Sequence, residues 1–71
     1  MIIFADYKEY NNKIRQYPII VEKPDINDLS EIRKKIGLGC CSCKLLRQRT
    51  NSNQEAINLH YKIVMELNNR S

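Results

Sequence analysis

The alternation of apolar and polar positions predicts a mainly helical chain, with its clearest helix near the C-terminus. From about Asn53 to Asn68, apolar residues recur every three or four positions, which is the spacing of one face of an α-helix. Ser52 followed by Glu55 fits a capping box, in which two side chains satisfy backbone N–H groups of the first turn. We therefore predict a long C-terminal helix. Its inner face carries Ala56, Leu59, Ile63 and Leu67.

Two shorter helices are predicted before it, joined by a glycine turn as a central helical hairpin. The first begins at Asp28, which pairs with Glu31 as a second capping box. Gly37 is placed to end it, because glycine readily adopts the left-handed conformation found just past helix C-termini. The second covers residues 40–49. The apolar residues of the first helix are Leu29, Ile32 and Ile36.

Residues 1–24 are predicted to form an N-terminal segment that ends in a short extended arm or strand. Residues 1–4 are apolar enough for a strand, and Asp6 with Glu9 can cap a helix that runs to about Gln16. Pro18 ends this helix, and the β-branched residues 18–22 favour an edge strand or an arm laid on another protein. The fold class is thus a small, mainly α domain over residues 1–71, with the hairpin and the long helix in 25–71.

The short chain predicts dependence on something outside itself. A domain of 71 residues buries only about 60% of the surface that its unfolded chain exposes, so its core is marginal. A partner, a dimer or a metal would supply what the chain lacks. No apolar stretch approaches the roughly 20 residues of a membrane span, and acids interrupt any signal peptide. We expect no membrane and an intracellular protein, cytoplasmic or within a virion or ribonucleoprotein assembly.

Positive charge is concentrated in the middle of the chain. The net charge is +4, and no acid occurs between Glu31 and Glu55. Cations without counter-charge favour nucleic acid or an acidic protein surface, although a solvated face that keeps the protein soluble is an equal alternative. The candidate binding residues are Arg33, Lys34, Lys35, Lys44, Arg47 and Arg49.

The three cysteines leave three interpretations open. Cys40 and Cys43 form a Cys-x-x-Cys pair, the spacing with which two thiolates bind one zinc ion, and a dimer could supply four ligands. The same pair at a helix start is typical of redox proteins, but no βαβ pattern surrounds it. The third interpretation is three reduced thiols, with Cys41 as a small core residue behind Leu38 and Leu45. Beyond zinc, we expect no cofactor.

The central hairpin resembles DNA-binding helix-turn-helix proteins over about 20 residues. Ile32, Ile36, Gly37, Leu38 and Leu46 match the apolar and turn positions of that family. The resemblance implies that Lys44 and Arg47 face the major groove while the basic residues 33–35 contact phosphates. Arg33 departs from the family, which has a small residue there because the two helices cross closely.

The sequence lacks the combinations of residues that are typical of catalytic sites. His60 is the single histidine, and no serine or acid lies at a spacing typical of a catalytic triad. No glycine-rich phosphate loop is present. We therefore expect no enzyme.

The leading functional hypothesis is a non-enzymatic interaction protein, a small basic subunit or regulator on a larger complex or homo-oligomer. The codon bias implied by many Ile, Asn and Lys residues is typical of AT-rich genomes, including viruses and phages. The alternatives are a nucleic-acid-binding module and a zinc-stapled module. The residues predicted to dock on a partner are Tyr7, Tyr10, Ile19, Ile20 and Val21.

Overall fold

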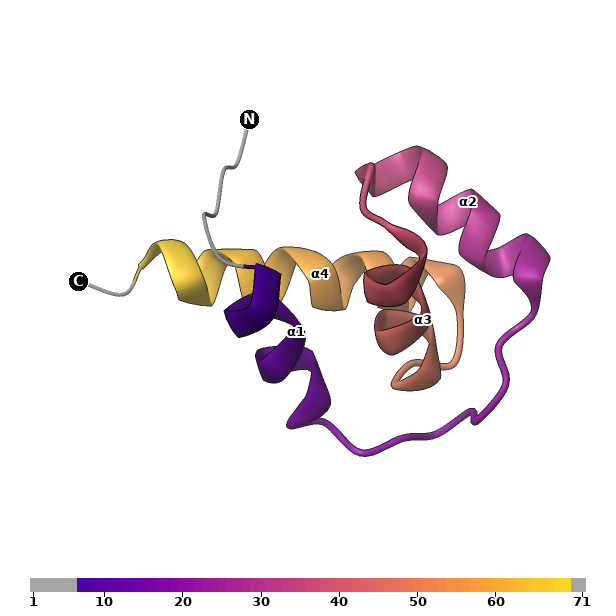
Figure 1. Cartoon of the computed structure of the whole chain (residues 1–71), viewed down its shortest axis with the longest axis horizontal. Helices are drawn as coiled ribbons and strands as arrows, with labels where there is room; N and C mark the ends of the chain where they lie inside the picture. Colours follow the sequence, from indigo (N-terminus) through magenta and orange to yellow (C-terminus); the bar gives the residue numbers. More distant parts are fainter. Residues whose placement is uncertain (1–6, 70–71) are drawn as a thin grey trace.

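The computed structural model describes residues 7–69 and shows a mainly helical protein (Figure 1). α4 is the longest helix and runs along the long axis of the molecule, with α1 and α3 lying across it and α2 beyond α3. α1 packs on α3 and α4, and α2 packs on the same two helices, but within residues 7–69 α1 and α2 do not touch. The four helices are α1 (Tyr7–Arg15), α2 (Ile26–Ile36), α3 (Cys40–Gln48) and α4 (Asn53–Asn68).

The start of α2 differs from the prediction. Asp25, not Asp28, is the N-cap, and its carboxylate accepts a hydrogen bond of 2.8 Å from the backbone N–H of Asn27. Asp25 can act as the cap because its backbone is extended, at φ −67° and ψ 137°, and aspartate is among the preferred N-cap residues. Asp28 therefore lies inside the first turn of α2, where its carboxylate is released from capping and reaches other elements.

The other helix ends agree with the predicted signals where the structure describes them. Gly37 ends α2 in the left-handed region, at φ 74°, and its N–H donates to the carbonyl of Arg33 at 2.8 Å. Ser52 caps α4 by accepting from the backbone N–H of Glu55 at 3.2 Å. The predicted strand over residues 1–4 and the cap at Asp6 lie outside the described residues.

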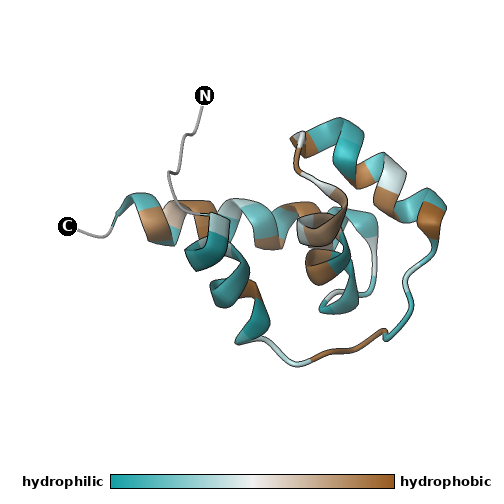
Figure 2. Ribbon diagram, viewed as in Figure 1, coloured by the Kyte–Doolittle hydropathy of each residue, from teal (hydrophilic) through white to brown (hydrophobic). Residues whose placement is uncertain are grey.

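The connection between α1 and α2 forms no strand, which corrects the edge-strand alternative for residues 18–22. It lies against the end of α3, where the N–H groups of Ile20 and Val21 both donate to the carbonyl of Gln48, at 2.7 and 2.9 Å. The side chain of Gln48 donates in turn to the carbonyl of Glu22 at 3.0 Å. The end of a helix has a few unpaired carbonyls and no row of alternating hydrogen-bonding groups such as a neighbouring strand provides. The segment is therefore held by hydrogen bonds without pairing as a strand. Figure 2 shows its apolar stretch.

All four helices contribute to one apolar core. Buried there are, among others, Tyr10 and Ile14 of α1, Ile32 of α2, Cys43 and Leu46 of α3, and Ile63 and Val64 of α4.

The structure corrects the prediction that Cys41 is the core cysteine. Cys41 is exposed and Cys43 is fully buried. Residues that are two positions apart in a helix lie about 200° apart around its axis. Because Cys43 and Leu46 face the core, Cys41 faces away from it. The choice between neighbouring cysteines depends on how α3 is rotated, which packing against α1 and α4 decides.

No helix within residues 7–69 combines the length and the apolar character that crossing a membrane requires.

Candidate docking surface between α2 and α3

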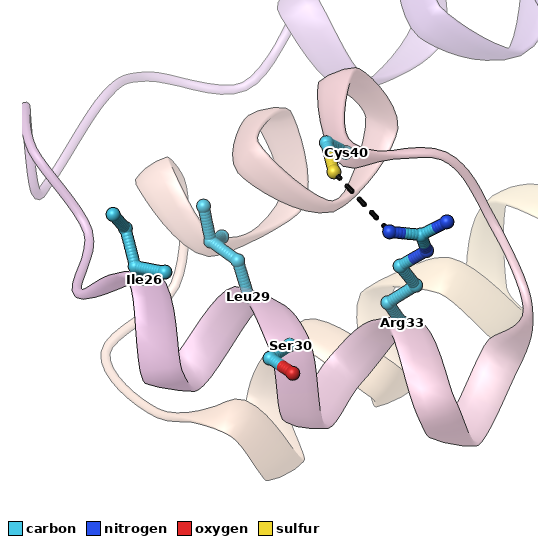
Figure 3. A pocket seen from close by; sticks show the side chains of 5 residues that line it. All are labelled: Ile26, Leu29, Ser30, Arg33 and Cys40. Atoms are coloured by element: carbon cyan, nitrogen blue, oxygen red, sulfur yellow. Dashed lines mark hydrogen bonds between the residues drawn. The ribbon is translucent and has the colours of Figure 1, made fainter.

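A groove of about 380 Å³ opens between α2 and the start of α3 (Figure 3). Ile26, Leu29, Ser30 and Arg33 line it from α2, and Cys40, the first residue of α3, lines it from the other side. The α2 residues share a face because they are spaced by three, four and seven positions. We call these five residues the α2–α3 groove.

The groove has an apolar end and a charged end. Ile26 is 79% exposed, the largest exposed fraction among the large apolar residues of the described chain, and Leu29 is half-buried beside it. At the other end, Arg33 donates through Nη1 to the sulfur of Cys40 at 3.8 Å, which joins the two helices (Figure 3). Apolar side chains and a cation are therefore presented side by side.

The acids of α2 lie on the opposite side of the helix from this groove. The carboxylate of Asp28 lies 3.6 Å from Nη2 of Arg47 and accepts from the side-chain amide of Asn53 at 3.3 Å. Glu31 accepts from the same amide at 2.5 Å. Both carboxylates are thus occupied by partners from α3 and α4, and they do not neutralise the cations of the groove.

Three of the six cations predicted to bind a partner lie at or near the groove, and a fourth, Lys35, lies on the far side of α2. Arg33, Lys34 and Lys35 are exposed in the last turn of α2, and Lys44 is exposed one turn after Cys40 on α3. Over residues 7–69, the ion pairs of the structure involve none of these four. Their charge is available to a ligand.

The remaining two cations, Arg47 and Arg49, hold the fold together. Arg47 donates to the carbonyls of Thr50 and Asn51, at 2.6 and 3.3 Å, and its side chain is only 12% exposed. Arg49 donates to the carbonyls of Tyr17 and Leu45, both at 3.1 Å. Burial, and secondly the charge of Arg15, lower the pKa of Arg49. The helix-turn-helix resemblance implies that Arg47 faces DNA, whereas in the structure it donates to backbone carbonyls of the loop after α3.

Of the residues predicted to dock on a partner, one is inaccessible. Tyr10 is fully buried, so it belongs to the core, which corrects that part of the prediction. Tyr7, Ile19 and Ile20 are each more than half exposed, and Val21 is half-buried. Their docking role stays a prediction.

Tyr10 and His60 form a buried polar pair in the core. The Tyr10 hydroxyl and Nδ1 of His60 lie 2.5 Å apart, and the rings meet edge to face with centroids 5.7 Å apart. Burial lowers the pKa of His60, and burial with the nearby Cys43 raises the pKa of Tyr10. Both groups are therefore neutral, and the hydroxyl donates to Nδ1 when the ring proton is on Nε2. The pair satisfies one ring nitrogen of His60 within the core.

The Cys-x-x-Cys pair is divided between surface and core. Cys40 is exposed in the groove, whereas the Cys43 thiol is buried and donates to the carbonyl of Leu38 at 3.7 Å. Burial, and then Cys40, raise the pKa of Cys43, against an opposing effect of Arg33. Within residues 7–69, no three or more His, Cys, Asp or Glu residues gather closely enough to hold a metal ion. Zinc binding stays a prediction.

The apolar end of the groove is what the sequence reasoning missed. With Asp28 as the predicted cap, Ile26 lies before the predicted helix. With Asp25 as the cap, Ile26, Leu29 and Arg33 fall on one face at helical spacing, a signal that was present in the sequence.

No protein-family model matches this chain, and no curated protein or solved structure matches it.

Proposed function

We propose that the protein is a non-enzymatic interaction subunit that docks on a larger protein through the α2–α3 groove and the cations beside it. The partner surface would be apolar where it meets Ile26 and Leu29, and acidic where it meets Arg33 and Lys44. Apolar contact supplies affinity, while charge complementarity steers the approach and fixes the register.

One observation carries this proposal: exposed cations without a carboxylate partner lie beside the exposed apolar end of the groove. Asp28 and Glu31 are bound by residues of α3 and α4, while Arg33, Lys34 and Lys35 have no carboxylate partner within residues 7–69. Glu31 lies three and four positions before Lys34 and Lys35, yet its carboxylate accepts from the Asn53 amide and pairs with neither lysine. Cations left without a carboxylate beside an apolar groove favour a partner of opposite charge.

The geometry supports a protein partner over nucleic acid. Nucleic-acid binding draws its affinity from many phosphate contacts, and two of the six predicted cations, Arg47 and Arg49, are committed to backbone carbonyls. The exposed Ile26 and half-buried Leu29 also offer phosphates nothing to bind. A helix-turn-helix module that binds duplex DNA is therefore the weaker alternative.

The test is native mass spectrometry of the tagged full chain, purified from its own cells. We expect one protein partner at a fixed ratio with the wild type. The double variant Arg33→Gln/Lys44→Gln should lose that partner, because two of the cations that match its acids are gone. The control Arg15→Gln removes a cation from α1, which does not touch α2, and should keep the partner.

The proposal would be overturned if the wild type is recovered without any protein at a fixed ratio, or if the double variant and the control retain the same complex. A duplex DNA titration at two salt concentrations tests the alternative. Phosphate contacts predict a steep loss of affinity with salt. Tight, salt-sensitive binding that the double variant loses would favour nucleic acid instead.

A further inference from the structure

We infer that the occupant of the α2–α3 groove is an acidic amphipathic helix of the partner protein. This inference rests on the proposed function and names the class of segment that the groove would bind. The dimensions of the groove, the order of its apolar and charged groups, and the charge around it each favour such an occupant.

The dimensions fit two turns of a helix. Ile26 and Arg33 mark the two ends of the groove on α2 and are seven residues apart, which is roughly 10 Å at 1.5 Å per residue. The volume of about 380 Å³ is at the small end of the range for pockets that bind ligands. Such a groove takes a few side chains from one face of a helix, as other helix-binding grooves do.

The order of the groups sets the pattern of the occupant. Ile26 and Leu29 lie at the open end of the groove, and Arg33 with its bond to Cys40 closes the other (Figure 3). A partner helix laid along α2 would place two apolar side chains, three or four positions apart, on Ile26 and Leu29. A carboxylate about one turn farther would then meet Arg33, which can bind it with two parallel hydrogen bonds.

The charge around the groove selects an acidic occupant and disfavours a second copy of this chain. Lys34 and Lys44 add to Arg33 beside the groove, while the acids of α2 are bound on the opposite side of the helix. The chain carries a net charge of +4, so two copies meeting at their most basic surfaces would repel each other. An acidic helix experiences the opposite force. Its apolar face would also cover Ile26, which no part of residues 7–69 covers.

The inference is tested by NMR titration of the full chain, labelled with 15N, against four alanine-based helical peptides of about 14 residues. The first carries Leu at i and i+3 and Glu at i+7. The second has Lys in place of Glu, and the third has Ala in place of both Leu residues. The fourth keeps the composition of the first but puts its Leu residues on opposite faces. NMR is chosen because it detects weak binding and also locates it.

We expect the first peptide to bind at least about tenfold more tightly than the other three, a difference of one decade in Kd. The amide signals that move should belong to α2 and the first turn of α3, and those of α1 should stay. Ile26→Asp should abolish this binding while preserving the fold, because an acid at the start of a helix is favourable. The matched control is Met65→Asp, which places the same charge on an exposed apolar position of α4 and should bind normally.

Three results would overturn the inference. The first is that the four peptides bind equally or not at all, and the second is that the moving signals lie outside α2 and α3. The third is that the free chain self-associates in sedimentation experiments and that Ile26→Asp abolishes this association. If the peptides fail while the native complex still loses its partner in Arg33→Gln/Lys44→Gln, only the helical occupant is refuted. If that complex also ignores the substitutions, the docking proposal fails with it.

Discussion

The basic residues at the end of α2 and those at the end of α3 carry the same charge and are put to different use. Arg33, Lys34 and Lys35 close α2 and are exposed. Arg47 and Arg49 close α3, and their guanidinium groups donate to four backbone carbonyls in three segments of the chain. A run of cations in a sequence is therefore not necessarily one binding surface. Part of it holds the fold, and the rest remains for a ligand.

Geometry explains why the two regions separate. The carbonyls at the C-terminal end of α3, and those of the segments beside it, lack enough helical partners and attract donors. An arginine has five N–H donors in a planar arrangement and satisfies several such carbonyls at once, whereas lysine has a single compact ammonium group. At the end of α2, the hydrogen bond of Arg33 is to the sulfur of Cys40, and within residues 7–69 the side chains of Arg33, Lys34 and Lys35 reach no backbone carbonyl, so these cations are left exposed.

The largest expected effect is on Arg47. Arg47→Met keeps the apolar stem but removes the bonds to Thr50 and Asn51 and leaves Asp28 without its cation. We expect the free energy of unfolding to fall by about 2–3 kcal/mol, the usual cost of losing bonds from a charged, mostly buried group. Urea unfolding followed by circular dichroism measures it. A stability equal to that of the wild type would mean that Arg47 is as dispensable as the α2 cations.

Arg49→Met should have a smaller effect, about 1–2 kcal/mol, because Arg49 loses bonds to two carbonyls but, unlike Arg47, leaves no carboxylate without its cation. Its loss should also release the connection between α1 and α2, which Arg49 holds through Tyr17. Hydrogen exchange at the amides of Ile20 and Val21, which bond to Gln48, would accelerate before the core amides do. Unchanged exchange at these two amides would show that Gln48 alone holds the segment.

Lowering the pH should destabilise the fold through His60. Because burial lowers the pKa of His60 below its ordinary 6.5, the unfolded chain takes up a proton that the folded chain excludes. The stability from the neutral ring is therefore complete above pH 6.5 and is lost as the pH falls below it, by at most about 1.4 kcal/mol per pH unit for one proton. Urea unfolding between pH 7.5 and 5 measures the slope. His60→Gln should flatten it, and an equal slope in this variant would assign the effect to carboxylates.

The smallest effect on stability is expected from Lys34→Gln and Lys35→Gln together. These exposed side chains have no ion pair within residues 7–69, so the free energy of unfolding should change by no more than about 0.5 kcal/mol. The small loss that remains comes from two cations near the negative end of the α2 dipole. A loss as large as that of Arg47→Met, in the same urea assay, would erase the difference between the two regions.

Local signals in the sequence were enough for most of the helices. The 3.6-residue spacing of Ala56, Leu59 and Ile63, with Ser52 as a cap, predicted α4 to its bounds, and Gly37 predicted the end of α2. These features depend on neighbours within one or two turns, so the sequence contains them. The predicted start of α2 was wrong because Asp25 and Asp28 are both suitable N-cap residues, and only one of them can cap the helix.

The candidate site could be predicted only in part, because it depends on contacts between distant residues. Counting charges found all six cations, but not that Arg47 pairs with Asp28, 19 residues away, or that Arg49 bonds the carbonyl of Tyr17, 32 residues away. The rotation of α3 put Cys43 in the core in place of Cys41. Tyr10 looked like an interface residue, and its partner His60 is 50 positions away. No local pattern reports such pairs.

The central claim is that a protein partner covers the α2–α3 groove, and a photo-crosslinker at position 26 tests it most directly. Benzoylphenylalanine replaces Ile26 in one form of the full chain and Asn58, an exposed residue of α4, in the other. After irradiation in the native cells, we predict one crosslinked protein product from position 26. Its crosslinked peptide should be rich in Asp and Glu, and position 58 should give no such product. Equal products from both positions, or crosslinks to nucleic acid alone at position 26, would contradict the account.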